Sequence, residues 1–284
     1  MNQSKYVVLL SLLFSVFACN GLESPPVAES SLPDSSVSDP VNPETPSTPD
    51  NSTNDYTTAV LLFNGTGVST SDWQSTETIV KSMGLSYQLV NTAQMNALSL
   101  DQLSNYGVII VPGGSGGTIY SNLTTATRLR IRQAIRDNGV GYVGFCAGAW
   151  VAVGPEADTN STASYGFAVA EGDILPYWYP DGNTSLVTAM VDVSFSDGTK
   201  RSLVWYGGPS TPEWSSGVIA RYDNGKPAIS QTFSGSGFVV ISGPHPEAPE
   251  GWRASAGFDS DGLDFDIVKA MINAALNRTA MAAF

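Results

Sequence analysis

The stretch of residues 138–150 reads NGVGYVGFCAGAW. Its apolar run, residues 140–145, is typical of a strand buried on both faces, and it ends in the G-x-C-x-G of residues 144–148. Glycines on both sides of Cys146 allow a tight strand-to-helix turn that presents a nucleophile at the edge of a sheet. The stretch therefore predicts a buried strand with Cys146 at its carboxyl end.

Similar apolar runs lie on either side of this stretch, with helical patterns between them. Amphipathic helices are expected after the first run, at 98–103, in the arginine-bearing stretch that stops at Asn138-Gly139, and at 264–277. Alternation of buried strands with helices favours an α/β fold whose mostly parallel sheet has helices on both faces. The expected strands are residues 59–63, 87–90, 108–111, 140–145 and 238–242.

The segment from residue 154 to 237 has a different composition, rich in Gly, Tyr, Trp and β-branched residues. Turn signals at 181–183, 196–198 and 223–225 predict β-hairpins. We interpret this segment as an inserted β-rich section that could roof a cleft at the carboxyl edge of the sheet, where open α/β sheets place their ligands.

The first residues indicate an exported protein. Lys5 precedes a short apolar run, and Ala18 leads directly into Cys19, as in the lipobox of bacterial lipoproteins. We expect a signal peptide over 1–18, then an acylated Cys19 and a Ser/Pro/Asp-rich tether over 19–56, and a folded domain over 57–284. The predicted location is the bacterial cell envelope, lipid-anchored and extracytoplasmic, at the outer membrane or cell surface. An ordinary signal peptide that leaves a spare thiol is the alternative.

Charge excludes two classes of partner. The chain has 26 acidic and 13 basic residues, for a net charge of −13. Neither nucleic-acid binding nor a basic membrane-binding face is expected, since both need clustered Lys and Arg. One helix carries four arginines, which we interpret as a solvated stripe rather than an anion site: Arg128, Arg130, Arg132 and Arg136.

The only histidine, His245, follows the run 238–242, and Glu247 lies two residues beyond it. A free thiol is mostly protonated at neutral pH, so an imidazole and a helix N-terminus are needed to make Cys146 a nucleophile. His245 would act as base and then acid, and Glu247 would hold its tautomer. With Cys19 acylated, Cys146 has no disulfide partner, and one histidine makes us expect neither metal nor cofactor. The alternatives are a buried structural cysteine and a hydrogen-bonded turn histidine.

Two further clusters have more than one interpretation. Aromatic residues could line a sugar or peptide cleft or simply fill the core: Trp178, Trp205, Trp214 and Trp252. Acidic residues near Gly262 could suggest a calcium loop, but their spacing does not match an EF-hand, and an acid-rich helix start is favoured: Asp259, Asp261, Asp264 and Asp266.

Four motifs together resemble the class I glutamine amidotransferase-like superfamily, and within it the N-terminal domain associated with biotin-protein ligases. They are VPGG at 111–114, GFCAGAW at 144–150, WYGGP at 205–209 and SGPHPE at 242–247. The resemblance implies a flavodoxin-like sheet and the catalytic triad Cys146, His245 and Glu247. An oxyanion would be bound by the Ala147 amide and an amide of the Gly113-Gly114 turn.

The chain departs from the amidotransferase pattern at one position. Such enzymes usually place a Gln two residues after the second glycine of the elbow, and this chain has Trp150 there. We therefore predict a thiol hydrolase or acyltransferase acting on an unknown amide or peptide-like substrate, rather than a glutamine amidase. The rival hypothesis is a non-catalytic binding or envelope-interaction lipoprotein that retains the fold.

Overall fold

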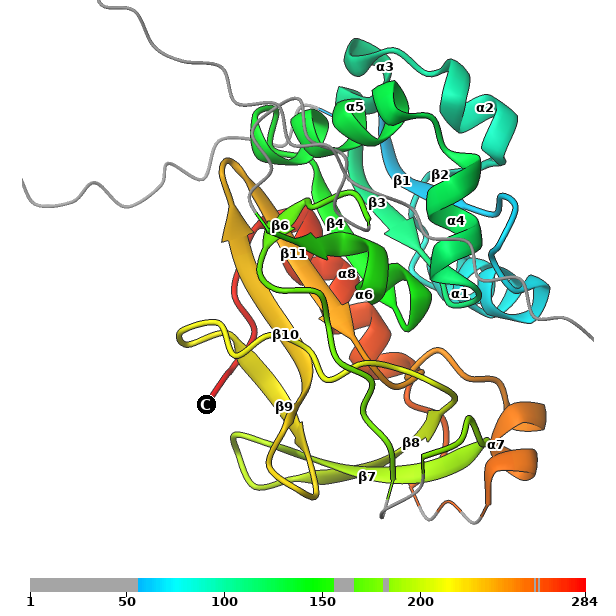
Figure 1. The fold of residues 1–284 in the computed structure, drawn as a ribbon, viewed down its shortest axis with the longest axis vertical. Coiled ribbons are helices and arrows are strands. Elements are labelled where there is room, and N and C mark those ends of the chain that lie inside the picture. The colour runs from blue at the N-terminus through cyan, green and yellow to red at the C-terminus, as the bar shows by residue number, and fades with distance from the viewer. Residues whose placement is uncertain (1–55, 156–165, 181–183, 258, 260) are drawn as a thin grey trace, which may run out of the picture. The chain divides into compact units, whose positions relative to one another are not determined.

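Nine strands form one sheet within the residues that this computed structural model describes, which are 56–155, 166–180, 184–257, 259 and 261–284. All of them lie in one unit of the chain, Ser52–Phe284. In order across the sheet (Figure 1) the strands are β2 (Tyr87–Val90), β1 (Thr58–Phe63), β3 (Tyr106–Val111), β4 (Gly141–Phe145), β11 (Gly237–Ser242), β10 (Pro227–Ser234), β9 (Val218–Tyr222), β7 (Ala189–Phe195) and β8 (Lys200–Trp205).

The half of the sheet from β2 to β11 is parallel throughout. Its order, with the second strand outside the first and the later strands following on the other side, is that of flavodoxin-like folds. The predicted α/β fold with a flavodoxin-like sheet is confirmed. Because parallel strands end at the same edge, the segments that follow β1, β4 and β11 meet there.

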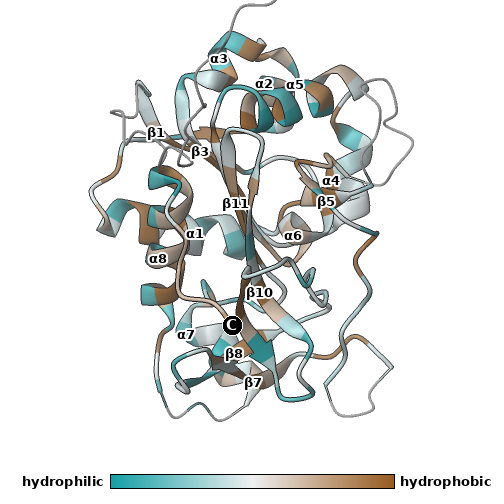
Figure 2. Cartoon of the chain, turned by 90° about the vertical axis from the view of Figure 1, so that its left-hand side faces the viewer, coloured by the Kyte–Doolittle hydropathy of each residue, from teal (hydrophilic) through white to brown (hydrophobic). Residues whose placement is uncertain are grey.

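Helices cover both faces of this half (Figure 2). On β1 the side chains alternate: Val60 and Leu62 belong to one apolar cluster and Leu61 and Phe63 to the other. The first cluster is closed by α1 (Thr70–Ser82) and α8 (Phe265–Asn277). The second is closed by α2 (Thr92–Ala97), α3 (Leu100–Ser104), α4 (Gly116–Asn122), α5 (Thr125–Arg136) and α6 (Ala147–Ala152).

The predicted β-rich section extends this same sheet with antiparallel strands. Turns at residues 196–198 and 223–225 join β7 to β8 and β9 to β10, as predicted. The third predicted turn, 181–183, lies outside the described residues. A short parallel pair, β5 (Val153–Gly154) with β6 (Ala170–Glu171), lies beside the main sheet, and α7 (Glu250–Ala256) contacts β7 and β8.

The short helix expected at 98–103 is present as α3, and a further helix that was not predicted, α2, precedes it. Each has a reciprocal capping box at its N-terminus. One expectation about local structure was wrong. The arginine stripe of α5 is not solvated, since Arg128 and Arg132 are both buried. Arg128 donates to the Tyr120 and Leu123 carbonyls, and Arg132 donates to the Phe167 carbonyl. These arginines therefore tie α5 to the end of α4 and to the segment before β6.

The acidic residues before α8 form ion pairs rather than a cap. Asp264 is the N-cap residue, but its carboxylate lies 2.7 Å from Arg201 and 3.0 Å from Arg253. Arg201 also contacts Asp261 and Asp266. The acidic cluster is therefore neutralised by arginines from β8 and α7.

The predicted signal peptide, the acylated Cys19 and the tether lie outside the described residues. None of the helices in the described part of the chain combines the length and apolar content that a bilayer crossing requires.

Candidate functional site

Cys146 occupies a sharp turn between β4 and α6, as the G-x-C-x-G pattern predicts. Its φ of 46° is a left-handed value that costs a non-glycine residue free energy, as at other nucleophile elbows. The turn depends on close packing, because a Cβ at Gly148 would lie 1.8 Å from the Val111 carbonyl oxygen. The surrounding fold therefore holds Cys146 in a strained position at the end of its strand.

His245 reaches the same place from β11. The Cys146 amide donates to the carbonyl of Ser242 at 2.8 Å, and the His245 amide donates to the carbonyl of Val204 on β8. Cys146 and His245 both line a pocket of about 380 Å³. The structure thus brings the predicted nucleophile and the predicted base to one cavity, although 98 residues of sequence lie between them.

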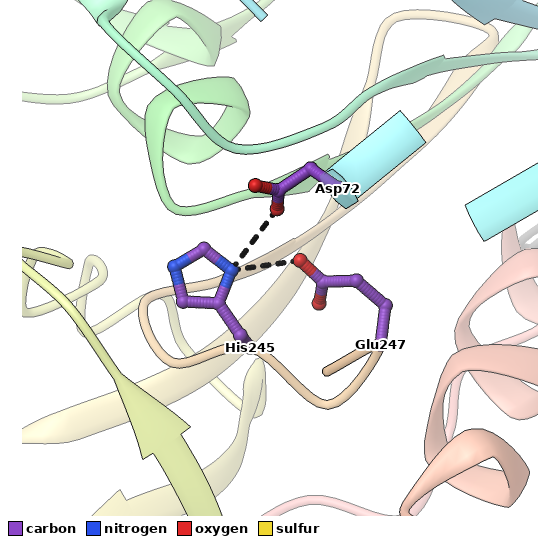
Figure 3. Close-up of side chains that lie close together, drawn as sticks. All are labelled: Asp72, His245 and Glu247. Atoms are coloured by element: carbon purple, nitrogen blue, oxygen red, sulfur yellow. Dashed lines mark hydrogen bonds and ion pairs between the residues drawn. The ribbon is translucent and has the colours of Figure 1, made fainter. Parts of the chain in front are cut away.

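Two buried carboxylates contact the same ring nitrogen of His245 (Figure 3). Glu247 Oε1 lies 2.8 Å from Nδ1 in a hydrogen bond, and Asp72 Oδ1 lies 3.3 Å from Nδ1 as an ion-pair contact. One N–H makes one strong hydrogen bond, so Glu247 is the main partner and Asp72 acts chiefly through its charge. Figure 3 shows the second ring nitrogen on the side away from both carboxylates.

Asp72 is a site residue that the sequence did not reveal as one. It lies in the first turn of α1, where an acidic residue has an ordinary explanation in the helix dipole. Its exposed fraction is only 2%. Its position could have indicated this role, because Asp72 follows strand β1, which ends at the same edge of the sheet as β4 and β11.

The three groups shift one another's pKa values. Burial alone would lower the pKa of His245, but the charges of Glu247, Cys146 and Asp72 outweigh it and hold that pKa well above its usual value. Burial raises the pKa of Glu247 to about 7, against the pull of His245. Burial would also raise the pKa of Asp72, yet His245 lowers it below its usual value. The raised pKa therefore favours the protonated imidazole near neutral pH, and this cation stabilises a Cys146 thiolate beside it.

Part of this chain matches a known protein family. Residues 58–155 match the family described as Biotin-protein ligase, N terminal. The resemblance found in the sequence is confirmed over that segment, which runs from β1 through the Cys146 elbow to β5. No curated protein matches the chain.

Solved structures that match include glutamine amidotransferases, at low identity. One is described as a glutamine amidotransferase, with 20% identity over 70% of this chain and 100% of that one, at a TM-score of 0.45. A glutamine amidotransferase from Thermotoga maritima has 13% identity over 78% and 97% of the two chains, at 0.48. The glutaminase domain of Trypanosoma brucei CTPS, with bound acivicin, has 14% identity over 80% and 97%, at 0.45. These likenesses concern the fold.

Two of the three residues predicted to bind an oxyanion, Ala147 and Gly114, lie beside Cys146 in the chain or in its pocket. Ala147 is the first residue of α6, and amides in a first helical turn lack intrahelical partners. Gly114 lines the pocket that holds Cys146. Gly113 packs behind the imidazole instead, since a Cβ there would lie 2.6 Å from Asp72 Oδ1 and 2.7 Å from His245 Cε1. The Gly114 amide is therefore better placed than the Gly113 amide to donate a hydrogen bond to an oxyanion.

The same cluster includes one set of residues that could hold a metal ion. The ligand atoms of Asp72, His245 and Glu247 lie within 4.8 Å of one another, and all three residues are buried. A cation there would take the position of the proton between Nδ1 and the carboxylates. The 2.8 Å hydrogen bond from Nδ1 to Glu247 already satisfies that nitrogen, so the arrangement fits the protonated cluster better than a metal centre.

The tryptophans divide between core and site. Trp178 and Trp205 are buried, and Trp178 stacks on Tyr222 with ring centroids 3.8 Å apart. Trp214 donates to the Glu171 carbonyl beside β6. Of these four tryptophans, Trp252 lines the pocket that holds His245, and the two rings lie edge to face with their centroids 5.5 Å apart.

Proposed function

We propose that this amidotransferase-like domain is a thiol hydrolase or acyltransferase that acts on an amide or peptide-like substrate. Cys146 is the nucleophile and His245 the general base and acid. Glu247 and Asp72 are positioning residues that act through the imidazole. The observation that carries the proposal is the buried imidazole held at Nδ1 by two carboxylates, in the same pocket as a strained cysteine.

The reaction follows from the roles of the two ring nitrogens. The thiol proton of Cys146 passes to Nε2 of His245 as the sulfur attacks the substrate carbonyl carbon, and the Ala147 and Gly114 amides bind the resulting oxyanion. The C–N bond then breaks, and His245 returns the proton to the leaving amine. Water or a second amine, deprotonated by His245, attacks the thioester carbonyl carbon. The C–S bond then breaks, the acyl group leaves as the acid or the new amide, and His245 returns the proton to the Cys146 sulfur.

The contacts of the Cys146 thiol support this role. The Cys146 sulfur lies 3.6 Å from the Tyr206 carbonyl oxygen, to which it donates weakly. Tyr206 belongs to the WYGGP loop, and this loop packs tightly on the turn that carries His245, because a Cβ at Gly208 would lie 1.9 Å from the Gly243 carbonyl oxygen. The sulfur and the imidazole are thus held in one rigid assembly.

Labelling with iodoacetamide across pH tests the proposal. The measurement is alkylation of the peptide that contains Cys146, followed by mass spectrometry so that Cys19 does not contribute. We expect rapid labelling below about pH 8 that is lost in His245→Ala. Asn138→Ala, at the opposite edge of the sheet, serves as the control variant. A thiol that stays inert in the folded protein would favour the rival, a non-catalytic binding module.

A glutamine amidase is a second candidate that the same protein can test. Trp150 stands where amidotransferases usually have a Gln, so we expect no ammonia release from free glutamine. Ammonia release that depends on Cys146 would identify glutamine as a substrate.

We further propose that the protein is anchored in the bacterial cell envelope through an acylated Cys19. The support is the sequence around Ala18-Cys19 and the polar segment that follows it. Metabolic labelling with palmitate in a bacterial host should mark the full chain and not Cys19→Ser. Export of an unlabelled, cleaved chain would instead indicate an ordinary signal peptide.

A further inference from the structure

Cys146 also lines a second pocket. Its volume is about 540 Å³. One wall is the glycine-rich turn at the start of α4, and the remainder is contributed by apolar side chains: Trp150, Ile174, Tyr177, Leu186 and Tyr206. Cys146, Gly114 and Tyr206 belong to both pockets, which are therefore continuous at the sulfur.

The apolar side chains of this pocket are unusually exposed. The exposed fractions are 59% for Ile174 and 53% each for Tyr177, Leu186 and Tyr206. Contiguous exposed apolar surface is rare on monomeric proteins and marks binding sites, because its contact with water is unfavourable. Among the described residues, these four account for most of the large apolar side chains that are exposed.

The aromatic part of the wall is organised before any ligand binds. The rings of Trp150 and Tyr177 lie 4.6 Å apart, and Tyr177 is stacked against Tyr179 at 5.7 Å. None of the residues that line this pocket is ionisable at neutral pH except Cys146 itself. An apolar group would bind here without stranding a buried charge, whereas a charged one would find no partner.

We propose that this second pocket binds an apolar acyl group of the substrate, preferably aromatic, whose carbonyl carbon lies at the Cys146 sulfur. The inference rests on the proposed function and specifies its substrate class. His245 must protonate the leaving amine, so the amine lies in the pocket that contains His245. The acyl group then extends to the opposite side of the sulfur, along Trp150 and Tyr177.

Acylation by two activated esters tests this assignment in the full-length protein. One is the p-nitrophenyl ester of hydrocinnamic acid, which carries a phenyl ring, and the other that of succinamic acid, which carries a polar amide. Each rate of acyl adduct formation on the Cys146 peptide is divided by the rate with free cysteine. We expect a preference for the phenyl ester of about tenfold or more, since apolar pockets discriminate by roughly 10–200-fold.

Two variants test whether the second pocket causes the preference for the phenyl ester. Tyr177→Ser should reduce it several-fold while leaving iodoacetamide labelling unchanged, because iodoacetamide is too small to use the pocket. Phe233→Ala, an equally exposed aromatic residue on β10 near the opposite sheet edge, should change neither value. Both variants alter exposed side chains, so neither is expected to prevent folding.

The outcomes separate the two proposals. If the Cys146 thiol does not react with iodoacetamide, the proposed function is rejected, and this inference with it. A reactive thiol with no preference between the esters would overturn the inference alone. Self-association that Tyr177→Ser abolishes, measured by sedimentation and accompanied by no ester preference, would assign the patch to a second copy of the chain and also overturn it.

Discussion

The two pockets that meet at Cys146 differ in the acidic and basic side chains that line them. The first contains His245 and Asp72, both nearly inaccessible to water, with Glu247 behind them. The second contains exposed aromatic and aliphatic side chains and, apart from the shared thiol, no titratable group at neutral pH. The difference assigns proton transfer to one side of the sulfur and selection of the substrate to the other.

The separation also reflects the two halves of the sheet. The parallel half delivers Cys146, His245 and Asp72 to one edge, while Tyr206, from the loop that follows β8 in the antiparallel half, closes both pockets. If proton transfer and selection are independent, variants on one side should change one property and leave the other intact. Variants that change both properties would show that proton transfer and substrate selection are not independent.

The largest expected effect is that of His245→Ala. Removing the general base should lower acylation by both p-nitrophenyl esters by about 100-fold or more, because general acid–base catalysis contributes 10²–10⁴-fold. The ratio between the two esters should stay unchanged. Rates of p-nitrophenolate release give both quantities, and a changed ratio would show that His245 also shapes the apolar pocket.

Glu247→Gln should produce the next largest effect. The amide cannot balance a protonated imidazole and can present the wrong hydrogen-bonding atom to Nδ1, so acylation should fall by about tenfold. The dependence of the rate on pH should move to lower pH, because loss of the carboxylate lowers the pKa of His245. An unchanged pH profile would contradict a positioning role.

Trp150→Gln should act on the other side of the sulfur. It restores the residue type usual in amidotransferases and adds a hydrogen-bonding amide to the apolar wall. We expect the preference for the phenyl ester to fall several-fold, with little change in iodoacetamide labelling. If labelling collapses as well, Trp150 supports the elbow itself, and the two sides are not independent.

Asp72→Asn should have a smaller effect than Glu247→Gln. Asp72 lies farther from Nδ1, at 3.3 Å against 2.8 Å, and contributes mainly charge. A reduction of acylation by a few-fold is expected, and the double variant should lose more than the sum of the single free-energy changes if each carboxylate partly replaces the other. Strict additivity, measured in a double-mutant cycle, would show that only Glu247 is used.

The smallest effect concerns stability. The pKa of Glu247 is raised to about 7, so the folded state binds a proton more tightly than the unfolded state. The free energy of unfolding should therefore fall as the pH rises from about 5 to 8, and the raised pKa of His245 acts in the same direction. Denaturation by urea should show a pH dependence that is weaker in Glu247→Gln by on the order of 1 kcal/mol. A free energy of unfolding that rises over this pH range would contradict tighter proton binding by the folded state.

The sequence revealed the parallel half well because buried strands leave continuous apolar runs. The ends of β4 and β11 follow from such runs, and with them the positions of Cys146 and His245. Asp72 could not be recognised, because an acidic residue at a helix start has a simpler local cause. Arg128 and Arg132 were misjudged for a related reason: their burial depends on carbonyls of Tyr120, Leu123 and Phe167, which only the tertiary structure brings near.

The antiparallel half was predicted only in outline. Two of its turns were recognised, but the two-residue turn Gly235-Ser236, which pairs β10 with β11 and so joins this half to the parallel half, was overlooked although it is a local hairpin signal. The helix α2 was missed although Asn91 and Gln94 form its capping box, because the helix has only one buried apolar side chain, Met95. Short elements held mainly by caps lack the hydrophobic periodicity on which sequence interpretation depends.

Because Cys146 lines both pockets, its position affects the order in which products leave and reactants bind. An amine released into the first pocket can diffuse out while the acyl chain stays lodged in the second, so the space it vacates becomes the entry for the incoming water or amine. The first product would depart before the second reactant arrives, which is ping-pong kinetics. With a competing amine acceptor, double-reciprocal plots should then be parallel lines, and the two reactants would never occupy the protein together.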